Sequence, residues 1–180
     1  MATALLLIDL QNDYFADDEL ARCRDDLVAA CNDLVRSARA AGAPVVEVQT
    51  VHAHDRSTWA LNMLDDGQGM ALEGSEGVRR VEGLLEADEV VVKTRDSAFF
   101  RTRLDELLDA KGVDRVVLTG VSTESCIAAT ATDAYARNLR VVLVRDATAS
   151  VTEELHEQTL DRLEKQYRQR ALWASEVGWG

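Results

Sequence analysis

Three side chains capable of acid–base or nucleophilic chemistry stand at the ends of apolar runs or early in a helical segment of this 180-residue sequence. Asp9 directly follows residues 5–8 and Lys93 follows residues 90–92, whereas Cys126 begins a helical segment. A carboxylate removed from water needs a partner, and a thiol at a helix N-terminus is expected to have a lowered pKa. A thiol, a proton acceptor and a cation that keeps the acceptor charged are what nucleophilic acyl transfer requires.

Each of the three residues also has an ordinary structural interpretation. Asp9 could form a turn or cap a helix, Lys93 could extend along apolar surface to solvent, and Cys126 could be an inert buried thiol. Only three of the 20 basic residues are Lys, which favours a need for a compact ammonium at position 93. The three residues together favour chemistry, because each follows a different expected strand.

The remaining cysteines indicate no disulfide framework, since three cysteines at irregular spacing do not make one. Cys23 and Cys31 are eight residues apart in a helical stretch, and we expect both to be small buried apolar residues. Thr123, three residues before Cys126, is the expected N-cap of the helix that follows.

Apolar runs alternate with amphipathic helical segments along nearly the whole chain. Short apolar runs predict strands at 4–10, 45–50, 89–93, 115–119, 141–144 and 172–177. Helical spacing predicts helices at 17–41, 102–110, 125–137 and 153–170. This alternation predicts an α/β fold, a parallel sheet covered by helices on both faces, with ligands bound beyond the carboxyl ends of the strands.

One long segment, residues 51–88, has no clear period, and we expect it to be a loop that determines the substrate. Without an internal repeat or a linker, residues 1–180 are expected to form a single domain. The formal charge of −12 argues against nucleic acid and anionic membranes as partners. No signal peptide or membrane span is recognisable, so we expect a soluble cytoplasmic protein.

Three segments resemble one known family. They are residues 7–15 (LIDLQNDYF), 92–102 (VKTRDSAFFRT) and 118–132 (LTGVSTESCIAATAT), followed by Asp133-Ala134 and by Asp146-Ala147-Thr148. Their order and spacing resemble the isochorismatase-like cysteine hydrolases, which include nicotinamidases and N-carbamoylsarcosine amidohydrolases, from residue 4 to about residue 160. The resemblance implies a three-layer α/β/α fold, Rossmann-like, with a central, mainly parallel six-stranded sheet in the order 3-2-1-4-5-6.

The resemblance also implies a role for each candidate residue. Asp9 would be the general base, Cys126 the nucleophile and Lys93 the cation between them. The backbone N–H groups of Ser122 and Cys126 would form the oxyanion hole, after a cis peptide bond between Val121 and Ser122. The implied reaction is hydrolysis of a C–N bond in a small amide, ureide or lactam through a thioester on the cysteine.

The expected substrate pocket is drawn from the loops around these residues. We expect Gln11, Phe15, His52 and Trp59 to line it, with Gln11 and Asn12 also ordering the loop that follows Asp9. No cofactor is expected, and the substrate itself cannot be identified from the sequence.

A metal ion is an alternative to this metal-free site. His52, His54 and Asp55 together could bind zinc. Metal-binding nicotinamidases have a D-W-H triplet after this strand, whereas this sequence has Thr50 in place of the Asp. The remaining histidine, His156, is expected on a surface helix, so no catalytic metal is predicted.

Two alternative functions remain. An isochorismatase would cleave a vinyl ether using Asp9 without the thiol, and a non-enzyme would be an inactive oligomeric partner with the same fold. We expect a homodimer or a higher homo-oligomer, with Trp173 and Trp179 either at a subunit interface or packed in the core.

Overall fold

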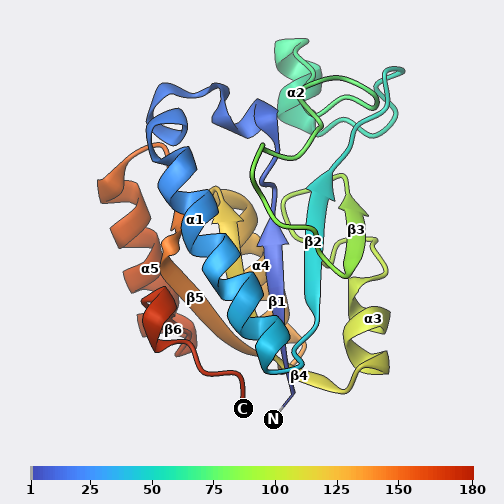
Figure 1. The fold of residues 1–180 in the computed structure, drawn as a ribbon. Coiled ribbons are helices and arrows are strands. Elements are labelled where there is room, and N and C mark those ends of the chain that lie inside the picture. The colour runs from blue at the N-terminus through green and yellow to red at the C-terminus, as the bar shows by residue number, and fades with distance from the viewer. Residues whose placement is uncertain (1) are drawn as a thin grey trace.

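The computed structural model describes residues 2–180. Six strands alternate with helices along the chain (Figure 1). The strands are β1 (Ala2–Ile8), β2 (Val45–Thr50), β3 (Glu89–Lys93), β4 (Val113–Val121), β5 (Arg140–Ala149) and β6 (Arg170–Leu172). The α-helices are α1 (Asp18–Ala40), α2 (Leu61–Asp66), α3 (Leu104–Ala110), α4 (Ala128–Ala136) and α5 (Glu153–Tyr167). Short helical turns occupy Asn12–Ala16, Thr123–Ile127 and Ala174–Glu176.

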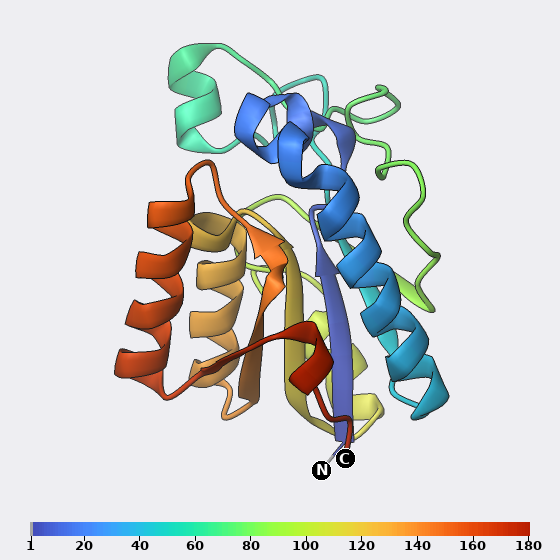
Figure 2. The same ribbon diagram turned by 60° about the vertical axis from the view of Figure 1, so that its left-hand side comes forward.

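The strands form one sheet in the order β3-β2-β1-β4-β5-β6, and every neighbouring pair is parallel. The predicted fold and strand order are confirmed, and the sheet is wholly rather than mainly parallel. Helices α3, α4 and α5 cover one face, and α1 with the C-terminal segment covers the other (Figures 1 and 2). The carboxyl ends of all six strands therefore lie at one edge, beneath the segment that contains α2.

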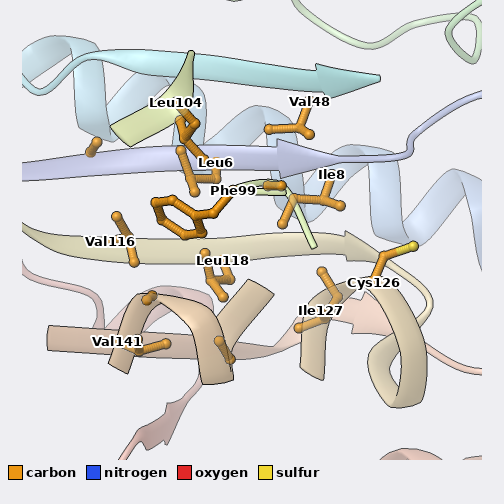
Figure 3. Close-up of a cluster of buried hydrophobic side chains, with 14 of the residues drawn as sticks. Leu6, Ile8, Val48, Phe99, Leu104, Val116, Leu118, Cys126, Ile127 and Val141 are labelled. Carbon is orange, nitrogen blue, oxygen red and sulfur yellow. The ribbon is translucent and has the colours of Figure 1, made fainter. Parts of the chain in front are cut away.

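The central strand β1 is buried on both faces, which explains its unbroken apolar sequence. Leu6 and Ile8 pack into the cluster shared with α3, α4 and α5 (Figure 3), whereas Leu5 and Leu7 pack against α1. Full burial of a Leu or Ile side chain contributes about 1.5–3 kcal/mol relative to exposure. The strand that carries Asp9 is thus held in the middle of the core.

Some predicted boundaries were wrong. The last strand is β6 at Arg170–Leu172 rather than residues 172–177, which instead include the turn Ala174–Glu176. The last long helix ends at Tyr167, because Arg168 adopts a left-handed conformation with φ of 58°. The helix predicted over 125–137 begins as a π-helical turn, Thr123–Ile127, before α4 starts.

The expected loop 51–88 contains α2 and has backbone pairing both within itself and to the chain that follows β1. His52 pairs with Leu72, and Gln11, in the loop after β1, pairs with Arg80. Asn12 N–H donates to the carbonyl of Arg79 at 2.9 Å, so the far part of this segment lies along the chain that follows Asp9.

The C-terminal tryptophans differ in their surroundings. Trp173 is 53% exposed, whereas the ring N–H of Trp179 donates to Ser37 Oγ at 3.1 Å against α1. The oligomeric state remains a prediction. Within residues 2–180, no helix combines the length and the apolar character needed to cross a bilayer.

Candidate active site

The strand-end residues of three neighbouring strands meet at the carboxyl edge of the sheet. Asp9 follows β1, Thr50 ends β2, and Lys93 ends β3 directly opposite Thr50 in the strand register. Asp9 N–H donates to the carbonyl of Val48 at 2.9 Å, which continues the pairing of β1 with β2 beyond Ile8. Parallel pairing therefore positions these residues, which are far apart in the sequence, side by side.

Asp9, Lys93 and Cys126, the predicted general base, cation and thiol, lie together. Lys93 Nζ lies 2.8 Å from Asp9 Oδ2 and donates to Cys126 Sγ at 3.3 Å. Asp9 is fully buried, Lys93 is 2% exposed and Cys126 is 3% exposed. Figure 3 shows Cys126 at the end of the apolar cluster, with its sulfur directed away from the cluster. The buried ammonium is thus shared between the carboxylate and the thiol.

Gly120 allows β4 to approach β1 immediately before Asp9. Its φ is +110°, and a Cβ atom at this position would lie 1.9 Å from the carbonyl oxygen of Ile8. Only glycine fits both the backbone conformation and the space. This close approach brings the turn that carries Cys126, which follows β4, toward the end of β1.

The charges in the site act on one another in a dry environment. Burial alone lowers the pKa of Lys93, but the charge of Asp9 and the hydrogen bonds with Asp9 and Cys126 raise it overall. The ammonium therefore stays charged at neutral pH. For Cys126, burial and the charge of Asp9 raise the pKa to about 12, against the lowering effect of Lys93.

The predicted lowering of the Cys126 pKa by a helix N-terminus was therefore wrong. Cys126 is the fourth residue of a buried π-helical turn, and desolvation outweighs the partial charge of the turn. The thiol is protonated in the resting site. Burial therefore favours transfer of the proton to a neighbouring base over its release to solvent.

The turn before Cys126 contains the predicted cis peptide bond between Val121 and Ser122. The carbonyl of Ser122 accepts hydrogen bonds from the N–H groups of Ser125 and Ile127, each at 3.2 Å, which closes the turn. The assignment of the Ser122 and Cys126 N–H groups to an oxyanion hole stays a prediction.

Thr123 does not cap this turn, so its predicted role as N-cap was wrong. Its hydroxyl instead lies 2.8 Å from Nδ1 of His156, which projects from α5. His156 was expected on the surface but is 5% exposed. The structure thus places a buried histidine behind the turn that carries the thiol.

Two residues of the site were not selected from the sequence. Thr50 Oγ1 donates to Asp9 Oδ1 at 2.8 Å and accepts from Lys93 Nζ and Tyr14 OH, each at 2.9 Å. The strand-end rule that selected Asp9 and Lys93 also applies to Thr50. Tyr14, in the turn after β1, gave no comparable signal.

The four expected pocket residues have different surroundings. Both ends of the Gln11 amide bond the backbone of Thr50 at 2.8 Å, and Phe15 packs in the apolar cluster beside α1. His52 is buried, with Nδ1 3.0 Å from the carbonyl of Thr58, and Trp59 donates to the carbonyl of Ala53 at 2.9 Å. Gln11 thus orders the loop after Asp9, as does Asn12 through the carbonyl of Glu76.

The candidate metal ligands His52, His54 and Asp55 have separate hydrogen-bond partners. Nδ1 of His52 faces the carbonyl of Thr58, Nε2 of His54 lies 2.8 Å from the carbonyl of Glu73, and Asp55 accepts from Ser57. These side chains therefore bond to three different partners. In the described part of the chain, no three His, Cys, Asp or Glu side chains are grouped to hold a metal ion.

A cavity of about 490 Å³ adjoins the turn of the thiol. Ser125 lines it together with Asp96, Ser97 and Glu124. The hydroxyl of Ser125 also donates to Cys126 Sγ at 3.6 Å. The wall of the cavity is thus one hydrogen bond away from the sulfur.

Comparison with known proteins places these features in a family. A probable inactive nicotinamidase of Arabidopsis thaliana is 36% identical over 166 residues, covering 86% of this chain and 84% of the relative. Nicotinamidase 3 of the same plant is 35% identical, covering 89% of this chain and 79% of the relative. The crystal structure of N-carbamoylsarcosine amidase from Thermoplasma acidophilum matches with a TM-score of 0.84 at 26% identity, covering 98% and 99% of the two chains. The isochorismatase domain model matches residues 3–175, and the chain belongs to the isochorismatase family of hydrolases.

Proposed function

We propose that this protein hydrolyses the C–N bond of a small amide, ureide or lactam through a thioester on Cys126. The observation that carries the proposal is the buried contact of one ammonium with both a carboxylate and a thiol, at 2.8 and 3.3 Å. Named relatives of the chain include a nicotinamidase and an N-carbamoylsarcosine amidase, whose substrates contain such bonds.

Proton transfer within the site starts the reaction. Asp9 takes the proton of the Cys126 thiol, and the resulting thiolate is stabilised by the ammonium of Lys93 at 3.3 Å. The transfer leaves the total charge of the three groups unchanged. It therefore avoids placing a second negative charge beside Asp9, the arrangement that raises the pKa of the thiol to about 12.

The remaining steps use the same groups. The thiolate sulfur attacks the carbonyl carbon, and the backbone N–H groups of Ser122 and Cys126 bind the oxyanion that forms. Protonated Asp9 donates its proton to the leaving nitrogen, the C–N bond breaks, and a thioester remains. Asp9 then takes a proton from water, which attacks the thioester and releases the acid. The thiolate recovers its proton from Asp9.

We propose that residues 51–88 shape the substrate site within a single domain, and that substrate approaches over Ser125. The support is the position of this segment above the strand ends (Figures 1 and 2) and the contact of Ser125 with both the cavity and the sulfur. His52, which lies in this segment, is close enough for the charges of Asp9 and Lys93 to affect its pKa.

Ammonia release from a panel of small amides tests the proposal. Nicotinamide, N-carbamoylsarcosine and simple lactams are suitable members, with opening of a lactam followed by mass spectrometry. Cys126→Ala and Asp9→Asn should each abolish turnover, whereas Cys31→Ala, which changes a buried thiol away from the site, should leave it. A panel without any turned-over member would support the inactive-partner alternative.

The vinyl-ether alternative is separated by the same variants. With isochorismate as the probe, that chemistry needs Asp9 but not the thiol. If isochorismate is cleaved, and Cys126→Ala remains as fast as the wild-type protein while Asp9→Asn is inactive, the cysteine-hydrolase proposal is wrong.

A further inference from the structure

We propose that Thr50 is a positioning residue of this site, which fixes the Asp9 carboxylate so that one defined oxygen receives the proton of Cys126. This inference rests on the proposed function. It assigns a role to a residue that ends β2 and whose side chain touches both Asp9 and Lys93.

The hydrogen-bonding capacity of the Thr50 hydroxyl is completely used. A hydroxyl has one proton to donate and two lone pairs that accept. Its proton goes to Asp9 Oδ1 at 2.8 Å, because an ionised carboxylate can only accept. Its lone pairs accept from Lys93 Nζ and Tyr14 OH, each at 2.9 Å, because the ammonium can only donate and no second hydroxyl proton is left. Each bond therefore has one possible direction.

The backbone of Thr50 is fixed independently of its side chain. Thr50 N–H donates to Gln11 Oε1, and Gln11 Nε2 donates to the carbonyls of Thr50 and Val78, all at 2.8 Å. Thr50 is 4% exposed and its register partner on β3 is Lys93. The branched side chain has few rotamers, so a clamped backbone determines where the hydroxyl points.

The two oxygens of Asp9 consequently have different surroundings. Oδ1 is occupied by the hydroxyl of Thr50, whereas Oδ2 lies 2.8 Å from Lys93 Nζ. The same ammonium donates to Cys126 Sγ at 3.3 Å, so Oδ2 is the oxygen paired with the cation that contacts the thiol. Each carboxylate oxygen has two lone pairs, so Oδ2 can receive the thiol proton while it pairs with Lys93, and rotation of the carboxylate would break the bond to Thr50.

The titratable groups whose pKa the charge of Asp9 affects are Lys93, Cys126, Tyr14 and His52. Burial and the charge of Asp9 raise the pKa of Tyr14, so its hydroxyl remains a donor to Thr50 across the working pH range. The donor from Thr50 to Asp9 is also independent of pH.

The test compares Thr50→Val, which keeps the shape but removes the hydroxyl, with Thr50→Ser, which keeps the hydroxyl. The assay uses the amide of the panel that the wild-type protein hydrolyses fastest. Thr50→Val should lower kcat about 10²-fold through misplacement of the base, with little change in KM. Thr50→Ser should restore kcat.

Thr119→Val is the matched control for loss of a buried threonine hydroxyl. Thr119 is fully buried and its hydroxyl donates to the carbonyl of Leu6 at 3.0 Å, away from the site. The proposal is overturned if Thr50→Val keeps the wild-type kcat, or if it loses no more activity than Thr119→Val. Should Thr50→Val not fold, a Thr50→Ser variant as slow as Cys126→Ala would overturn it, whereas near-wild-type activity together with a slower Tyr14→Phe variant would support it.

The same assay tests the proposed thioester route separately from the role of Thr50. If Cys126→Ala and Asp9→Asn are as active as the wild-type protein, the thioester route fails whatever Thr50 does. If both are inactive while Thr50→Val is fully active, only the role of Thr50 is lost.

Discussion

Cys31 and Cys126 are two buried thiols with different neighbours. Each has its pKa raised to about 12, mainly by burial. Cys31, on α1, has the carbonyl of Ala147 at 3.8 Å, whereas Cys126 has the ammonium of Lys93 at 3.3 Å and the carboxylate of Asp9 beside that ammonium. The direction of the pKa shift therefore does not distinguish the proposed nucleophile from a core thiol. The difference lies in whether a base and a cation are available to take the proton and stabilise the thiolate.

Removal of the Lys93 ammonium, which Cys126 contacts and Cys31 lacks, should have the largest effect. Lys93→Met leaves Asp9 as a buried charge without its ion-pair partner, which should lower the free energy of unfolding by about 3–5 kcal/mol and abolish activity. Lys165→Met is the control, since its pair with Asp161 is exposed and should contribute about 1 kcal/mol or less. Urea denaturation of both variants measures the contrast. Equal losses of stability in the two variants would show that the Lys93–Asp9 pair contributes no more than an exposed pair.

The thiols should also differ in their reactivity toward iodoacetamide, a small amide itself. Cys126 should be alkylated before Cys31 and before the partly exposed Cys23, because among these thiols Cys126 alone has an ammonium at hydrogen-bond distance to stabilise its thiolate. Limited labelling of the folded protein followed by peptide mapping gives the order. Faster labelling of Cys23 or Cys31 would remove the distinction.

Much of this arrangement could be predicted from the sequence, because buried parallel strands have continuous apolar runs and their ends meet at one edge. That rule identified Asp9 and Lys93, and it also applied to Thr50. The burial of His156 likewise had a signal, since Thr159, Leu160 and Leu163 follow it at helical spacing and share its buried face.

Other features depend on three-dimensional surroundings that spacing does not describe. The sign of the Cys126 pKa shift depends on whether desolvation outweighs the effect of the Lys93 ammonium. That balance can be judged only when the burial of the thiol is known. The π-helical turn and the bond from Thr123 to His156 depend on how α5 packs behind the turn. The end of the last helix depends on Arg168 adopting a positive φ, which a sequence of this kind does not indicate.

A smaller difference between the surroundings of the two thiols depends on pH. His156 lies 2.8 Å from the hydroxyl of Thr123 in the turn of Cys126. Burial lowers the pKa of His156, against Glu153 and Glu157, which raise it, while Arg145 lowers it further. Below about pH 6.5 the unfolded chain binds a proton that the folded site resists, so stability should fall by up to about 1.4 kcal/mol per pH unit. His156→Gln should reduce this slope in urea titrations between pH 7 and about pH 5. An unchanged slope would show that His156 does not cause this pH dependence. Buried His52, whose pKa is also lowered, should account for the part of the slope that persists in His156→Gln.

Removal of metal ions should have the smallest effect. Within residues 2–180, no three His, Cys, Asp or Glu side chains are grouped to hold a metal ion. We therefore expect dialysis against a chelator to leave the rate of ammonia release unchanged. A loss of activity that zinc or manganese restores would return His52 to the chemistry.

The most direct test of the account is the capture of the thioester on one of the two buried thiols. The protein is mixed with a turned-over amide, quenched with acid within one turnover, and measured by intact mass and peptide mapping. We predict an added acyl group on Cys126 in the wild-type protein and in Cys31→Ala, and none in Cys126→Ala, which should release no ammonia. Ammonia release by Cys126→Ala near the wild-type rate, or an acyl group found on Cys31, would contradict the account.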